Sequence, residues 1–115
     1  MDANAALLIF KKFREDDGTV LCEGSLFGLS FVFRGKVTGV GENGEVDIQV
    51  SDGEASFRLS VFADGLKFKY KEPREFPVLR KILPEEARTA MALVVEFPDR
   101  SLTARVERVV AIEIT

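Results

Sequence analysis

The hydrophobic and polar residues between Leu26 and Val40 alternate along the chain, which is the pattern of a β-strand with one buried face. The apolar side chains that share one parity are Phe27, Leu29, Phe31, Phe33 and Val37. A straight strand of this length would measure roughly 45–50 Å, so it must bend to fit into a small domain. Gly35 and Gly39 are the positions where we expect it to bend. The pattern therefore predicts a strongly bent, barrel-like sheet around this strand.

A stripe of apolar residues with helical spacing precedes the strands, and its members are Ala6, Ile9, Phe10 and Phe13. The stripe predicts a helix over residues 3–15, which Asp2 or Asn4 can cap and which residues 16–18 end. A strand is the competing interpretation of this segment. We expect the helix to lie against the sheet or to close one end of a barrel.

Four shorter stretches read as strands as well, at residues 19–23, 45–50, 55–63 and 66–70. Turn-forming residues separate these strands, at Gly24-Ser25, residues 42–45, residues 51–54 and Asp64-Gly65. Within the second turn, Asn43-Gly44 suits the positive φ angles of a type I′ hairpin turn. The spacing of strands and turns predicts an antiparallel β-meander over residues 19–70.

Residues 71–90 break this regular pattern, because Pro73, Pro77 and Pro84 do not suit a central strand. Pro84 followed by two acidic residues is typical of the first turn of a helix, so we expect an irregular crossover with a short helix. Strand patterns return over residues 92–97 and 102–114 and predict a β-hairpin over residues 92–114. A bulge near residues 107–109 would keep Arg108 out of the core.

Together these elements predict a single globular domain over residues 1–115, of the mainly β class. An N-terminal helix is followed by six or seven mostly antiparallel strands in a strongly bent sheet or small β-barrel, and a two-layer β-sandwich is the alternative. The predicted core joins Phe10 and Phe13 of the helix to the inward side chains of the sheet, which are Phe27, Phe31, Phe33, Phe57, Leu59 and Phe68. Replacing Phe31 with Ala in such a core costs roughly 3–5 kcal/mol of stability.

The charge of the chain limits the classes of partner. The net charge is -3 and the pI is about 5.1, which argues against nucleic acid as the main partner. The apolar run near the N-terminus is short, and Asp2 stands where a signal peptide carries basic residues. We therefore expect a cytoplasmic protein with neither a nucleic-acid partner nor a membrane partner.

The alternating run Lys67-Phe68-Lys69-Tyr70-Lys71 places its lysines on one face of a strand and its aromatic residues on the other. Leu66, Phe68 and Tyr70 are expected to point inward. A lysine-rich face is typical of an edge strand that is protected against pairing with other chains. Binding of a polyanion is the alternative interpretation.

Residues that carry enzyme chemistry are scarce. The chain has no histidine, so imidazole catalysis, a Ser-His-Asp triad and histidine metal ligands are all excluded. Cys22 is the only cysteine; it can form no intramolecular disulfide, and we expect a buried, inert thiol. The paired carboxylates Asp16-Asp17 and Glu85-Glu86 are explained by helix ends. The sequence thus predicts no catalytic residue, no metal site and no cofactor, which favours a non-enzymatic protein.

One apolar segment has no regular strand pattern and forms the candidate interaction surface, with Phe76, Val78, Leu79, Arg80, Ile82 and Leu83 as its residues. Long irregular connections in small domains are usually functional, although this one is also suited to cover the core. We therefore predict a small binding or protein-interaction module whose partner is another protein or a second copy in a homodimer. The alternative is a carrier or sensor of an apolar small molecule held between the helix and the Phe-rich sheet face.

Overall fold

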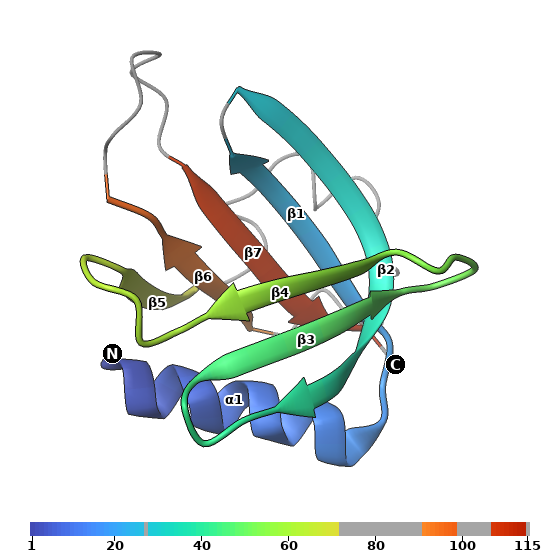
Figure 1. The fold of residues 1–115 in the computed structure, drawn as a ribbon, viewed down its shortest axis with the longest axis horizontal. Helices are drawn as coiled ribbons and strands as arrows, with labels where there is room; N and C mark the ends of the chain where they lie inside the picture. Colours follow the sequence, from blue (N-terminus) through green and yellow to red (C-terminus); the bar gives the residue numbers. More distant parts are fainter. Residues whose placement is uncertain (27, 72–90, 99–106, 115) are drawn as a thin grey trace.

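A computed structural model describes residues 1–26, 28–71, 91–98 and 107–114 of the chain. The fold is mainly β, with one N-terminal helix, α1 (Ala3–Asp16), followed by strands (Figure 1). The strands are β1 (Val20–Leu26), β2 (Leu29–Val40), β3 (Glu45–Val50), β4 (Ser56–Ser60), β5 (Lys67–Lys71), β6 (Ala92–Glu96) and β7 (Arg108–Glu113). The predicted helix and the predicted mainly β class are confirmed. The predicted crossover and short helix of residues 72–90 lie outside the described residues.

All seven described strands hydrogen-bond in one antiparallel sheet, in the order β4-β3-β2-β1-β7-β6-β5. Within the described ranges, β4 and β5 each pair with a single neighbour, so the sheet is not closed and the predicted barrel is wrong. Neither a strong bend nor the β-sandwich alternative is confirmed. The predicted meander stops at β4, because the chain then crosses within residues 61–66 to the opposite edge, where β5 pairs with β6.

Helix α1 begins and ends where its sequence predicts. The Asp2 carboxylate accepts a hydrogen bond from the Ala5 amide at 2.8 Å, which satisfies one of the free amides of the first turn. Asp17 adopts a left-handed conformation with φ 49° after the last turn and stops the helix. The buried face consists of Ala6, Leu7, Phe10 and Phe13, so the apolar stripe is centred slightly differently from the predicted one.

The long alternating stretch is divided between two strands. The chain reverses between Leu26 of β1 and Leu29 of β2, where Gly28 supplies a φ of 79°. Gly24-Ser25, which we predicted as the turn, lies inside β1 and pairs with β2. The register between β2 and β3 shifts between Val37 and Gly39, close to one of the two positions where we expect a bend.

The hairpin between β2 and β3 lies at the predicted position but has different geometry. Gly44 has a φ of 87°, whereas Asn43 does not have a positive φ, so the turn is not of type I′. The Gly41 amide donates to the Glu45 carbonyl at 2.8 Å, which closes a wider loop. The Asn43 side chain accepts a hydrogen bond from the Glu45 amide at 3.4 Å and supports this loop instead.

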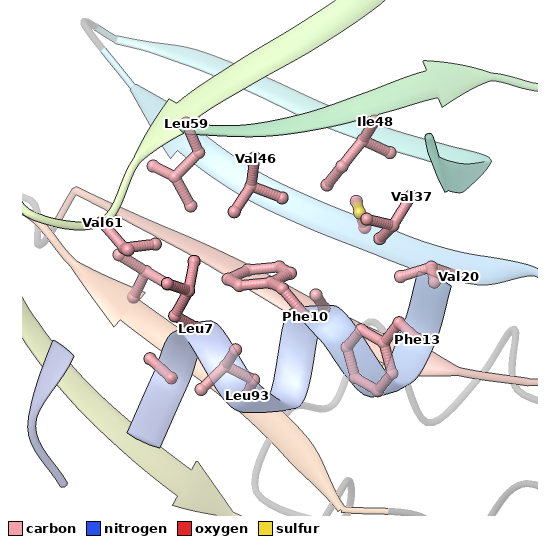
Figure 2. Packing of buried hydrophobic residues seen from close by; sticks show 14 of the residues in the cluster. Leu7, Phe10, Phe13, Val20, Val37, Val46, Ile48, Leu59, Val61 and Leu93 are labelled. Atoms are coloured by element: carbon pink, nitrogen blue, oxygen red, sulfur yellow. The ribbon is translucent and has the colours of Figure 1, made fainter. Parts of the chain in front are cut away.

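The main hydrophobic core lies between α1 and the sheet (Figure 2). It receives side chains from the helix and from all seven described strands. Four of the eight predicted core residues are buried in it, namely Phe10, Phe13, Leu59 and Phe68. Phe33 and Phe57 are only partly buried and pack against it, while Phe31 is partly buried outside it. The eighth, Phe27, lies outside the described residues.

A second buried cluster occupies the opposite face of the central strands and contains Leu21, Ala92, Val94, Val110 and Ile112. Strands β1, β6 and β7 therefore bury side chains of both parities, which explains why the sequences of β6 and β7 are nearly continuous apolar runs. The prediction of a bulge near residues 107–109 is wrong for the paired residues 108–110. Arg108, Val109 and Val110 pair in uninterrupted register with β6, and Arg108 avoids burial because it begins the strand.

Candidate interaction surface

Strand β3 pairs with the second half of β2 but not with its first half. Between Leu29 and Arg34, β1 is the only described strand beside it, whereas pairing with β3 begins at Gly35 (Figure 1). The Arg34 carbonyl still accepts a hydrogen bond from the Ser51 amide at 2.8 Å on the β3 side. Because backbone groups alternate between the two sides of a strand, the amides and carbonyls of Ser30 and Val32 point to this same side. We call residues 29–33 the open β2 edge.

Three partly buried phenylalanines gather beside the open β2 edge and form what we call the aromatic triangle: Phe31, Phe33 and Phe57. The ring centroids of Phe31 and Phe33 lie 5.9 Å apart in a stacked arrangement. Phe57 of β4 approaches these two rings at 5.9 and 6.3 Å with tilted planes. All three distances fall within the range of favourable aromatic contacts. The triangle therefore joins two strands that are not neighbours in the sheet.

Gly24 of β1 makes room for one ring of the triangle. A Cβ atom at this position would collide with the ring of Phe31, which lies across the glycine from the neighbouring strand. The pairing of an aromatic residue with a strand glycine covers backbone that would otherwise face water. Gly24 thus leaves room for the Phe31 ring over β1, and the ring stays partly exposed.

Apolar residues also face solvent along the open β2 edge. Leu29 is 71% exposed, and Val32, on the face opposite to Phe31 and Phe33, is 48% exposed. Val32 belongs to the polar parity of the alternating stretch, in agreement with its exposure. The edge therefore offers backbone groups that no described strand pairs with, between apolar side chains on both faces, a combination that favours pairing with another strand.

The outer edge at β5 is protected, in contrast to the open β2 edge. The predicted lysine-bearing edge strand is confirmed, since Lys67 and Lys69 are exposed and Lys69 forms an ion pair with Glu96 at 2.9 Å. Tyr70 is 46% exposed rather than buried, because it lies near the end of an edge strand where its hydroxyl stays in water. Charged side chains of this kind hinder the approach of a further strand.

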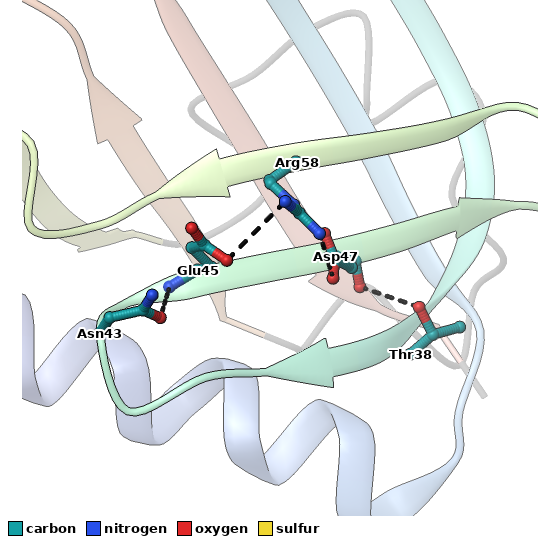
Figure 3. A network of polar contacts seen from close by, with 5 residues as sticks. All are labelled: Thr38, Asn43, Glu45, Asp47 and Arg58. Atoms are coloured by element: carbon teal, nitrogen blue, oxygen red, sulfur yellow. Dashed lines mark hydrogen bonds and ion pairs between the residues drawn. The ribbon is translucent and has the colours of Figure 1, made fainter.

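A polar network covers the exposed face of β3 and β4 (Figure 3). Arg58 donates a hydrogen bond through Nε to Asp47 at 2.7 Å, and its Nη1 lies 3.8 Å from Glu45. The hydrogen bond from Arg58 lowers the pKa of Asp47 below its ordinary value. Thr38 at the β2 irregularity donates to the Asp47 carbonyl at 3.4 Å. Asp47 and Arg58 are direct cross-strand partners, so the network supports the register of β3 and β4.

The ionisable groups of the described residues include one buried thiol and one carboxyl group with a raised pKa. Cys22 is buried, and burial raises its pKa to about 12, so the thiolate needed for chemistry is not formed at neutral pH. Across residues 1–26, 28–71, 91–98 and 107–114, no cluster of acidic or cysteine side chains is arranged to hold a metal ion. Burial, with the Asp16 carboxylate as a second cause, raises the pKa of Glu113. A hollow of about 260 Å³ is lined by Lys11, Arg14, Glu15 and Val40 and brings no such groups together.

The predicted interaction surface of residues 76–83 lies outside the described residues and stays a prediction. Sequence reasoning missed the aromatic triangle, because the alternation of Phe31 and Phe33 is the same for a buried face and a half-exposed face. One signal was available: the alternating stretch around β2 is about twice as long as the strand that follows it. A partner strand that is too short leaves part of the longer strand without a neighbour.

The single helix of the described part is neither long nor apolar enough to cross a membrane. Comparison of the chain with known protein families, with curated proteins and with solved structures gives no match.

Proposed function

We propose that this protein is a small, non-enzymatic interaction module that binds an extended polypeptide segment at the open β2 edge. The observation that carries the proposal is that no described strand pairs with the outward backbone of Ser30 and Val32, next to a partly exposed aromatic triangle. In strand addition, main-chain hydrogen bonds supply affinity and pockets for alternate side chains supply specificity. The backbone edge and the rings provide these two elements side by side.

A strong bend of the sheet around α1 is part of the proposal. The main core contains residues of the helix and of all seven strands, which supports a sheet that curves around one helix. The contact of Phe57 on β4 with Phe31 on β2 also supports it, because two other strand pairings separate these residues in a flat sheet. On this proposal the bend creates the concave aromatic surface that a bound segment covers.

The segment that suits this surface carries apolar residues at alternate positions, because only one of its faces meets the aromatic triangle. An exposed Arg34 follows the edge and would attract an acidic residue at the end of the bound segment. We propose a cytoplasmic setting, for which a free thiol at Cys22 is suitable.

The carrier function, which the sequence leaves as the alternative, receives less support. Phe10, Val46 and Leu93 are fully buried and fill space between the helix and the sheet (Figure 2). A carrier needs an apolar cavity of several hundred cubic ångströms at this position. The full burial of these three side chains supports a packed core at this position, so we propose the polypeptide-binding surface in preference to the carrier.

A library of linear peptides displayed on phage tests the proposal directly. We expect selected peptides to alternate in hydrophobicity and to shift the NMR signals of the Ser30 and Val32 amides. Val32→Pro removes one amide donor from the open edge, so it should weaken peptide binding about tenfold or more. Val32→Ala keeps that donor and serves as the matched control.

Two results would refute binding at the edge. The first is that selected peptides shift signals elsewhere and leave Ser30 and Val32 unchanged. The second is that Val32→Pro and Val32→Ala bind the peptides equally well.

A further inference from the structure

We infer that the open β2 edge pairs with the same edge of a second copy of the chain, across a twofold axis. This inference rests on the proposed function, because it names the occupant of the same surface. The outward backbone groups belong to Ser30 and Val32, with Phe31 between them. In an antiparallel pair centred on Phe31, Ser30 of each copy lies opposite Val32 of the other. Each such pair exchanges two hydrogen bonds, so the edge gives four in total.

The side chains of the open edge are compatible with this twofold register. Phe31 lies opposite Phe31 of the second copy at a position without hydrogen bonds, where facing side chains approach most closely. Leu29 lies opposite Phe33 of the second copy. A twofold axis perpendicular to the sheet places both aromatic triangles on the same face of the joined sheet. The apolar groups that one copy exposes are therefore those that the other copy covers.

Charge also favours a second copy as the occupant. Residues 29–33 carry no charged side chain, so no like charges face each other within the paired segment. The first charged residue beyond it is Arg34, whose outward carbonyl is already bonded to the Ser51 amide of the same chain, so the pairing with a second copy ends before it. The lysine-bearing β5 edge has no such compatibility, because an antiparallel twofold pairing there brings lysines of two copies together.

The size of the surface sets the expected strength of the dimer. A stable interface buries about 800 Å² on each partner, and smaller interfaces belong to weak or transient complexes. A five-residue edge with partly covered rings is smaller than this standard. We therefore expect a dimer that forms between micromolar and millimolar protein concentration and is in rapid exchange with the monomer.

Sedimentation equilibrium over this concentration range is the test. For the wild type we expect the mass to rise from that of one chain to that of two. Val32→Pro removes the two Val32 amide donors of the dimer and should weaken association about tenfold or more. Proline is tolerated at a strand edge, and the Val32 amide takes no part in pairing with β1. Val32→Ala keeps both amides and should weaken association much less.

Amide hydrogen exchange in the wild type provides a second measurement that needs no variant. The inference predicts that the Ser30 and Val32 amides become more protected as the protein concentration rises. A wild type that stays monomeric at millimolar concentration overturns the inference, and so does a dimer that Val32→Pro forms as readily as Val32→Ala. If that monomer still binds selected peptides at the edge, self-pairing is wrong while the proposed interaction function stands.

Discussion

At the scale of single residues, Gly35 shows how closely the backbone of β2 approaches β3. A Cβ atom at Gly35 would collide with the carbonyl oxygen of Gln49, which belongs to the backbone of the neighbouring strand. A backbone oxygen within a sheet ladder cannot move aside as the end of a side chain can. Gly35 lies where β3 pairing begins, so the close approach occurs at the start of the paired half of β2.

Gly35→Ala should therefore destabilise the protein by roughly 1–3 kcal/mol, the usual cost of an overpacked site. Gly53→Ala is the matched control, because a Cβ atom there meets only ordinary van der Waals contact. We expect the control to change stability by no more than about 0.5 kcal/mol in urea unfolding experiments. Equal effects of the two substitutions would show that the close approach at Gly35 has no energetic consequence.

Glu113 provides a pH-dependent contribution to stability. Burial is the main cause that raises its pKa above the ordinary value of 4.5; the Asp16 carboxylate adds to the shift and Lys12 opposes it. A carboxyl group whose pKa is raised on folding stabilises the protein at pH values below its unfolded pKa. This contribution is lost as the pH rises through the folded pKa, because the unfolded state ionises more readily.

Glu113→Gln removes this unfavourable ionisation, so the variant should be more stable than the wild type at neutral pH. The group is only partly buried, so we expect a gain of no more than about 1 kcal/mol that vanishes near pH 4. Urea unfolding at a series of pH values measures it, and Glu15→Gln, on the exposed face of α1, controls for the change in net charge. A gain that is the same at every pH would contradict a titration effect.

At the scale of elements, local patterns predicted most helix and strand positions but not which strands are neighbours. Helix α1 and strand β3 follow from side-chain period, and the turn near Gly44 follows from residue type. The pairing of β5 with β6 does not follow from local sequence. A turn such as Asp64-Gly65 is compatible with a next strand that pairs locally and with one that pairs at the far edge of the sheet. Strand partners depend on contacts that are distant in sequence, which periodicity does not record.

The candidate site was less predictable than the elements, for a related reason. Phe31 and Phe33 belong to the apolar parity of their strand, and parity defines a face without defining what covers it. Their exposure depends on the length of β3, on the position of Gly35 and on the path of β4. The free backbone of Ser30 and Val32 has no signature in residue type at all, because every strand carries the same amides and carbonyls.

At the scale of the whole molecule, α1 organises one main core. The helix contributes Ala6, Leu7, Phe10 and Phe13, and every described strand contributes at least one buried residue to the same cluster. A cluster of this kind links the two edges of the sheet through the helix rather than through strand pairing. We therefore expect the helix and the sheet to unfold in one transition.

Phe10→Ala should cost roughly 3–5 kcal/mol, because the ring is fully buried among core residues and leaves a cavity that the sheet cannot fill. Phe31→Ala would cost the same amount if Phe31 were fully buried. Its ring is partly exposed outside the main core, so we expect a loss of stability of only about 1–2 kcal/mol. Urea unfolding followed by circular dichroism measures both losses.

If Phe31→Ala is as damaging as Phe10→Ala, the aromatic triangle is part of the core and is not available to a partner. If Phe10→Ala is nearly neutral, the helix does not hold the sheet together. A large loss for Phe10 and a small one for Phe31 would separate the residues that maintain the fold from those that remain free to bind.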